Sequence, residues 1–141
     1  MKAPWLHIAL DELLLGVQEV PGPGSNSRIN LYLATVGMAP DDEISWCSGF
    51  GNYCLIESGC PGTGKPNARS FLSWGVPCGP VPGAVCILWR GSPGGWQGHV
   101  GFLLWVSATH VYLLAGNQQD AVSVAPFPLD RVLGYRVPKG D

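Results

Sequence analysis

A cysteine and a histidine in this sequence have the neighbours that thiol catalysis needs. Cys47 lies in the segment SWCSGF (45–50), where a helix is expected to begin, and His99 lies in GHVGF (98–102), where a strand is expected to begin. A thiol is a strong nucleophile only as the thiolate, and a helix N-terminus or an imidazolium lowers its pKa from about 8.5 to between about 3.5 and 7.5. The pair predicts a Cys47 nucleophile with His99 as general base and acid. Taken alone, Cys47 would more often be a buried, inert thiol.

The third residue of this site is predicted from a β-hairpin. If Val106 pairs with His110 across the turn, His99 and Asn117 face each other on one side of the sheet. Asn117 would then orient the imidazole, as the third member of a Cys-His-Asn triad does. A turn one residue longer would move Asn117 to the other face unless a bulge restored the register. Asp120 is the alternative third member.

Small residues occur where the cysteine helix and the hairpin are expected to meet. Gly101 and Ala115 would make the hairpin face that carries His99 shallow. Gly49 and Gly51 each cost a helix about 1 kcal/mol relative to alanine, which indicates that another element approaches it closely. We therefore expect the helix to lie on the shallow face and to bring its first turn to the imidazole. A backbone N–H of that first turn could also stabilise an oxyanion.

The spacing of apolar and turn-forming residues predicts helices followed by strands. A 3–4 periodicity and N-cap candidates predict helices over 4–18, 28–36 and about 45–58, and a short helix over 67–74. Alternating apolar segments predict strands over 84–89, 99–106, 111–115, 121–125 and 133–137. This order is typical of an α+β domain with N-terminal helices on one side of a C-terminal antiparallel sheet, here a meander of about five strands. We expect one domain, 1–141.

Composition restricts the classes of function. Eight basic and ten acidic residues give a net charge of −2 without a cluster of lysine and arginine, which argues against a nucleic-acid partner. Five cysteines without a Cys-x-x-Cys pair argue against a zinc site, and we expect no metal or cofactor. No apolar run approaches the roughly 18 residues that span a bilayer. His7, Asp11 and Glu12 interrupt any signal peptide, so we expect synthesis in the cytoplasm and, if the protein is exported, a possible Cys60–Cys78 bridge.

Several residues are candidates for substrate contact. Trp46 and Ser48 flank the nucleophile, and Trp96 lies in a glycine-rich loop (91–96) that is expected to form a mobile wall of the site. Packing in the core is the alternative for both tryptophans, and Trp5 is expected to be core. The segment GCPGTGK (59–65) has the spacing of a phosphate-binding loop, but Pro66 stands where a serine or threonine would hold magnesium, so a surface loop is expected.

The segments WCSGF (46–50), GHVGF (98–102) and GNQ (116–118), in this order, resemble the CHAP (cysteine, histidine-dependent amidohydrolase/peptidase) and NlpC-type enzymes, which are papain-like peptidoglycan hydrolases. The resemblance covers nearly the whole chain and is greatest to small phage or prophage endolysin-like members. It implies Cys47 as nucleophile, His99 as base and acid, and Asn117 as the orienting residue. Many NlpC-type members carry Asp before the nucleophile and His as third residue, so Trp46 and Asn117 favour the CHAP-like side.

The expected function is therefore hydrolysis of an amide bond of bacterial cell-wall peptide through a cysteine acyl-enzyme. A peptidoglycan endopeptidase and an N-acetylmuramoyl-L-alanine amidase both remain open. We expect a monomer with no membrane or nucleic-acid partner that acts on the wall after release or export. A catalytically inactive wall-binding or phage-structural module on the same fold is the alternative.

Overall fold

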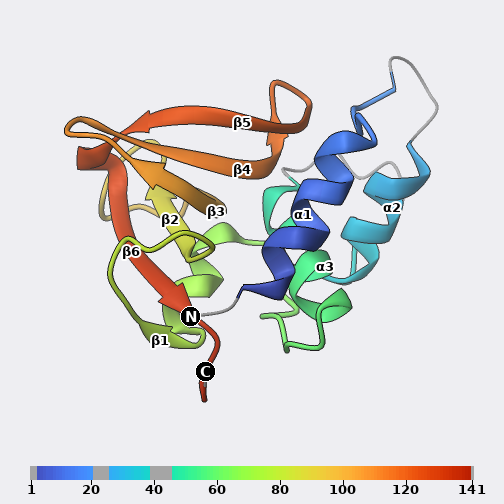
Figure 1. Cartoon of the computed structure of the whole chain (residues 1–141), viewed down its shortest axis with the longest axis horizontal. Helices are drawn as coiled ribbons and strands as arrows, with labels where there is room; N and C mark the ends of the chain where they lie inside the picture. The colour runs from blue at the N-terminus through green and yellow to red at the C-terminus, as the bar shows by residue number, and fades with distance from the viewer. Residues whose placement is uncertain (1–2, 21–25, 39–45, 141) are drawn as a thin grey trace.

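The computed structural model describes residues 3–20, 26–38 and 46–140, and it has the predicted α+β architecture. Figure 1 shows α1, α2 and α3 gathered on one side of a C-terminal antiparallel sheet. The helical elements are α1 (Pro4–Leu14), α2 (Ser27–Ala34), α3 (Cys47–Glu57) and two 3₁₀ turns, η1 (Ala68–Ser73) and η2 (Leu129–Arg131). The strands are β1 (Val76–Pro77), β2 (Val85–Trp89), β3 (Gly98–Val106), β4 (His110–Gln118), β5 (Ala121–Pro128) and β6 (Val132–Val137).

Local sequence signals set the helix ends. Pro4 occupies the first turn of α1, and Gly16 adopts a φ of 70° just after the helix, so α1 ends earlier than the predicted residue 18. Asn26 caps α2, because its side chain accepts a hydrogen bond of 2.8 Å from the Arg28 backbone N–H. The predicted cap of α3, Ser45, lies outside the described residues.

A buried carboxylate joins the three helices. Glu12 is 4% exposed and accepts two hydrogen bonds from Arg28, at 2.6 and 2.8 Å, and one of 2.6 Å from the Tyr32 hydroxyl. Arg28 also donates to the Tyr53 hydroxyl at 2.7 Å. Burial, together with the hydrogen bond to Glu12, raises the pKa of Tyr32, which keeps that hydroxyl a donor. A buried charge is tolerated only when it is paired in this way, so the cluster holds α1 and α2 against α3.

The sheet has six strands in the order β1-β6-β2-β3-β4-β5. The predicted meander is confirmed for β2 to β5, but the last strand departs from it. β6 crosses back to pair with β2, with Val85 opposite Arg136, instead of continuing beside β5. β1 pairs with the outer side of β6 and has only two residues, which is too short to show a periodicity. The sheet thus has one more strand than predicted.

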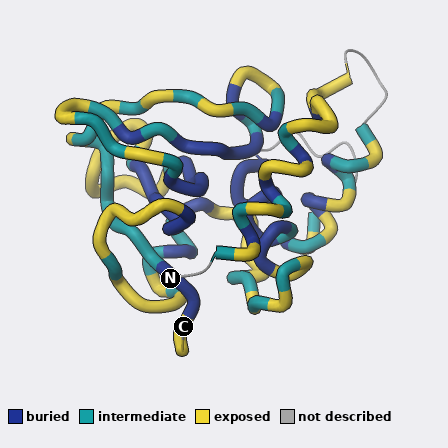
Figure 2. Tube along the Cα trace, viewed as in Figure 1, coloured by how far each residue is buried: buried dark blue, intermediate teal, exposed yellow. Residues whose placement is uncertain are grey.

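Both faces of the sheet are apolar. One face packs against the helices, and the other forms a smaller cluster of Cys86, Leu88, Leu103, Val111 and Leu113. Figure 2 shows the buried segments concentrated in the inner strands and in the helix that faces them. Trp5 is core as predicted: it is 1% exposed, and its indole N–H donates to the Gly83 carbonyl at 2.7 Å. Among the described helices, none is long and apolar enough to cross a membrane.

Candidate active site

Cys47 is the first residue of α3, as the sequence predicts, and the helix buries its predicted face. Cys47, Phe50 and Cys54 are all 2% exposed or less. A Cβ on Gly49 would lie 2.8 Å from the Tyr32 carbonyl oxygen, so α2 is the element that approaches this helix closely. The position at a helix N-terminus exposes the Cys47 side chain to the positive end of the helix dipole, which favours a thiolate.

The helix packs on the sheet through Gly116, which corrects the predicted contact. A Cβ on Gly116 would lie 2.7 Å from the Phe50 Cβ and from the Trp46 ring. Gly101 and Ala115 do lie together, since a Cβ on Gly101 would be 2.7 Å from that of Ala115, but this contact is on the sheet face of the smaller apolar cluster. Alternation along the strands therefore gives α3 the Gly116 face and not the Gly101 face.

His99 interacts with Cys47 through both charge and a hydrogen bond. His99 is near the start of β3, opposite Leu88 of β2, and is 6% exposed. Burial works to lower the pKa of His99, but the charge of Cys47 and hydrogen bonds to Cys47 and Gln118 raise it above its ordinary value. A raised pKa favours the protonated imidazole, and a protonated imidazole beside a thiol is one half of a thiolate–imidazolium pair.

Gln118 holds the other side of the imidazole. Its Oε1 lies 2.9 Å from His99 Nε2, and its amide nitrogen donates to the carbonyl oxygens of Ser123 at 2.8 Å and Leu113 at 3.3 Å. Because the two carbonyls can only accept, they fix the amide with its oxygen toward His99. Nε2 must then carry a hydrogen, which leaves Nδ1 for Cys47. The site is a hydrogen-bonded series of Cys47, His99 and Gln118.

The hairpin has one irregularity in β3 and one in β4, and the one in β4 brings Gln118 to the imidazole. Val106 pairs with Val111 and not with His110, and a shift between Leu103 and Trp105 then restores the predicted register, with Phe102 opposite Leu114. A second shift lies between Ala115 and Gln118 of β4, where it pairs with β5. Within it Asn117 has a φ of 60°, a left-handed conformation that asparagine tolerates better than most residues. The second bulge is the feature that the sequence interpretation missed.

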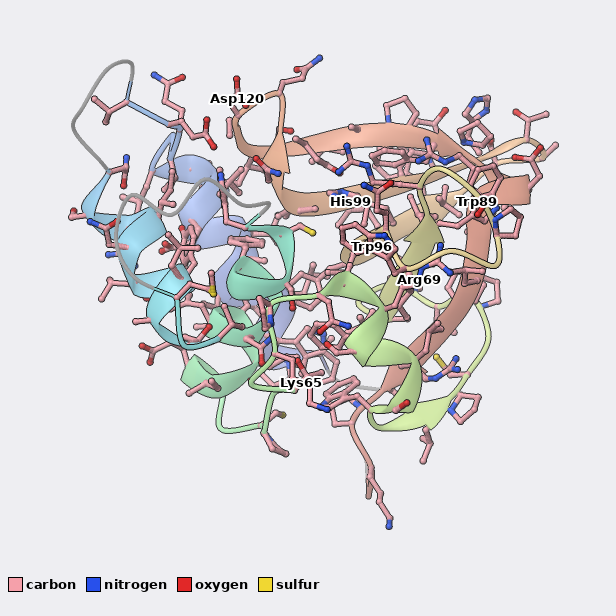
Figure 3. All side chains as sticks on the ribbon, turned by 180° about the vertical axis from the view of Figure 1, so that it is seen from behind. Lys65, Arg69, Trp89, Trp96, His99 and Asp120 are labelled. Atoms are coloured by element: carbon pink, nitrogen blue, oxygen red, sulfur yellow. The ribbon has the colours of Figure 1, made fainter. Side chains whose placement is uncertain are left out.

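The alternative third residue, Asp120, lies in the β4–β5 turn. It is exposed, has a φ of 60°, and its backbone carbonyl accepts a hydrogen bond of 2.8 Å from the Glu19 N–H. Figure 3 shows Asp120 in this turn, away from His99. Asp120 therefore does not take the place beside the imidazole that Gln118 occupies.

The two residues that flank Cys47 make hydrogen bonds within the protein. Trp46 is 2% exposed, its indole N–H donates to Glu19 Oε1 at 2.7 Å, and its ring stacks on Tyr32. Ser48 is fully buried and its hydroxyl donates to the Lys65 carbonyl at 2.7 Å. Both side chains point into the protein and fix the first turn of α3.

The glycine-rich segment 59–65 is a loop, as predicted, and it is fastened to α3. Asn52 is fully buried, accepts a hydrogen bond of 2.8 Å from the Gly64 N–H, and donates to the Thr63 hydroxyl at 3.2 Å. A Cβ on Gly62 would overlap the Asn52 amide, so glycine is required there for the loop to lie this close. The loop therefore packs along one side of α3.

Trp96 is the one predicted substrate residue that is open to solvent, with 78% of its surface exposed. Its loop is held in place by Arg69, which donates to the carbonyl oxygens of Ser92, Pro93 and Gln97 at 2.8, 2.9 and 2.8 Å. Trp96 precedes His99 by three residues, so their Cα atoms lie within about 10 Å of each other. Figure 3 shows Trp96, Arg69 and His99 grouped along the β2–β3 loop. The loop is therefore held against η1 by the Arg69 guanidinium.

The four other cysteines do not belong to the series of Cys47, His99 and Gln118. Burial raises the pKa of the Cys54 thiol well above its usual range and that of Cys86 to about 12, as expected for inert core cysteines. Cys60 and Cys78 are half-buried free thiols with no bridge between them. Within the described ranges, no group of three or more histidine, cysteine or acidic residues could hold a metal ion.

Comparison with known proteins gives no family for this chain. No protein-family model matches it, and a search of the curated proteins finds no significant match.

Proposed function

We propose that this chain is a cysteine peptidase or amidase of the CHAP/NlpC type that cleaves an amide bond of bacterial cell-wall peptide. The observation that carries the proposal is the series of side-chain contacts from Cys47 through His99 to Gln118. A nucleophile at a helix N-terminus, a base in contact with it, and a third group that orients the base are the parts that nucleophilic catalysis requires.

The reaction follows from these contacts in two steps. The Cys47 thiolate attacks the amide carbonyl, a carbon–sulfur bond forms, and the protonated His99 gives its proton to the leaving nitrogen as the carbon–nitrogen bond breaks. His99 then takes a proton from water, whose oxygen attacks the acyl-enzyme and displaces the thiolate. The products are a free amine and a free carboxylic acid, and Cys47 and His99 return to their starting state.

Gln118 takes the orienting role in place of the predicted Asn117. Its oxygen accepts from Nε2 and so presents Nδ1 to the thiol in both the neutral and the protonated imidazole. Since both ring nitrogens are then engaged, the site needs no further side chain to fix the tautomer. A glutamine can replace an asparagine here because the bulge in β4 brings residue 118 to the imidazole.

The choice of cell-wall peptide as substrate rests on the resemblance of the three segments to peptidoglycan hydrolases. Trp96 is the exposed aromatic surface that a peptide or sugar could contact beside His99. Action on the wall after release or export, by a monomer, belongs to the same proposal.

Digestion of purified sacculi tests the proposal. We expect Cys47→Ala and His99→Ala to abolish the fall in turbidity while the far-UV circular dichroism stays that of the wild type. Cys60→Ala is the matched control, since it removes a half-buried thiol away from His99 and should retain activity. Mass spectrometry of the released fragments identifies the cleaved bond, and full activity of Cys47→Ala would exclude the mechanism.

Alkylation separates an enzyme from a non-catalytic wall-binding module. A thiolate at Cys47 should react with iodoacetamide well below pH 8, and faster than the buried Cys54 and Cys86, whose raised pKa values keep them protonated. Equally slow labelling of all five cysteines, together with binding to sacculi, would favour the binding module.

A further inference from the structure

Three of the five arginines in the sequence gather around the β2–β3 loop beside His99, although they are far apart in the chain. Arg69 donates to three carbonyl oxygens of this loop, and Arg131 donates to the Trp89 carbonyl at 3.0 and 3.2 Å. Arg90 begins the loop itself. Among the described residues, Arg28 and Glu12 form the one ion pair. The three guanidiniums at the loop therefore have no carboxylate partner among these residues. Three positive charges therefore lie around this loop in a chain whose net charge is −2.

Arg90 differs from the other two because its side chain is available. Arg69 and Arg131 already use their N–H groups on backbone carbonyls, whereas Arg90 is exposed and its side chain makes no hydrogen bond within the described part of the chain. A guanidinium with open N–H groups presents the planar donor set that matches a carboxylate.

The strand register places Arg90 next to His99. Leu88 pairs with His99 and Trp89 with Gly98, and the Arg90 N–H donates to the Gln97 carbonyl at 3.1 Å, which extends the ladder by one pair. This backbone bond places Arg90 opposite Gln97, which precedes His99 by two residues in the chain. The positive charge of Arg90 is also among the effects that act to lower the pKa of His99.

We propose that Arg90 and Trp96 form a subsite for a carboxylate on the part of the substrate that leaves as the amine. This inference rests on the proposed function, because it uses the role of His99 as the acid that protonates the leaving nitrogen. The leaving residue must lie on the His99 side of the broken bond, and Arg90 is the charged group on that side. Trp96, on the other arm of the same loop, packs against the backbone or side chain of that residue. The substrate class is therefore an acidic peptide whose amine-side residue carries a free carboxylate.

A matched pair of substrates tests the subsite. The stem peptide cleaved in the sacculus digestion is synthesised with either a carboxylate or a carboxamide on the residue whose amine is released. We expect the wild type to prefer the carboxylate by about tenfold in kcat/KM, as one exposed charge-assisted hydrogen bond would give. Arg90→Gln should lose this preference through KM, so that its kcat/KM on the carboxylate falls to its value on the carboxamide. Trp96→Ala should weaken both substrates alike, because packing does not depend on that charge.

The controls separate the two levels of the proposal. Lys139→Gln removes one exposed positive charge near the C-terminal end of the chain, and it should change neither rate. Equal rates of the wild type on both peptides, or an equal loss on both in Arg90→Gln, would overturn the subsite while Cys47-dependent turnover still supports the enzyme. Absence of any turnover that Cys47→Ala abolishes would overturn the enzyme and the subsite together.

Discussion

Replacement of Gln118 by alanine tests the assignment on which the site depends. The change removes the acceptor of His99 Nε2–H inside a site where the imidazole is 6% exposed. A buried polar group left without its partner costs about 1–3 kcal/mol, and each 1.36 kcal/mol is a factor of ten in rate or equilibrium. We therefore expect kcat/KM to fall by about 10- to 100-fold, because the imidazole no longer holds one tautomer and one orientation toward Cys47.

The pH dependence of the same variant has a predicted sign. The hydrogen bond to Gln118 favours the protonated imidazole and contributes to the raised pKa of His99, against the larger lowering effect of burial. Without it the pKa of His99 falls. Since the active form needs the imidazolium, the alkaline limb of the kcat/KM profile should move to lower pH. The profile is measured on the stem peptide identified from sacculi.

Asn117→Gly is the matched control for Gln118→Ala. Glycine adopts the φ of 60° observed at Asn117 without strain, so this variant removes the neighbouring side chain and keeps the bulge. We expect activity within about threefold of the wild type. Substitutions of surface residues usually change the free energy by less than about 0.6 kcal/mol, which corresponds to less than a threefold change in rate. The assignment of Gln118 would be refuted if Asn117→Gly lost activity and shifted the alkaline limb while Gln118→Ala did neither.

Three further variants test the packing and the electrostatics. Gly116→Ala should destabilise the fold by about 1–3 kcal/mol in urea denaturation, because the new methyl would lie 2.7 Å from carbon atoms of α3 and its cap, whereas Gly79→Ala meets nothing within 4 Å and should be neutral. Glu12→Gln should cost about 2 kcal/mol by the same measurement, since it breaks a pair whose arginine is one-third exposed, and activity per folded molecule should remain. In Cys47→Ala the pKa of His99, followed by NMR, should fall, because the thiolate that raises it is gone; an unchanged value would contradict the ion pair.

The parts of the fold that the sequence predicts are those with a strong local signal. The three helices and the five longer strands follow from periodicity, and Cys47 follows from its position at a helix start. The two-residue β1 and the return of β6 to β2 have no such signal, because strand pairing depends on contacts distant in sequence. The same limit applies to the three arginines at the β2–β3 loop, because they are far apart in the sequence and meet only in the folded chain.

The residue that contacts the far side of the imidazole could not be predicted from local sequence patterns alone. The register of the β3–β4 pair was predicted correctly at Phe102 and Leu114, although the turn itself is one residue longer than expected. The second bulge, which was not predicted, brings Gln118 to the imidazole. The sequence offers a signal for it, since Gly116 and Asn117 are both turn-forming residues inside a strand pattern. A bulge next to a candidate catalytic residue agrees with the known concentration of bulges near active sites.

The contacts around the series form a closed path that explains how three distant segments hold one geometry. From Cys47 the path runs through His99 to Gln118, whose strand ends in the turn that contains Asp120. The Asp120 carbonyl accepts from the Glu19 backbone, and the Glu19 carboxylate accepts from the indole of Trp46, the residue before the nucleophile. The links join α3, β3, β4, the β4–β5 turn and the segment that follows α1. Trp46 therefore supports the site from within the core, by setting the position of the first turn of α3.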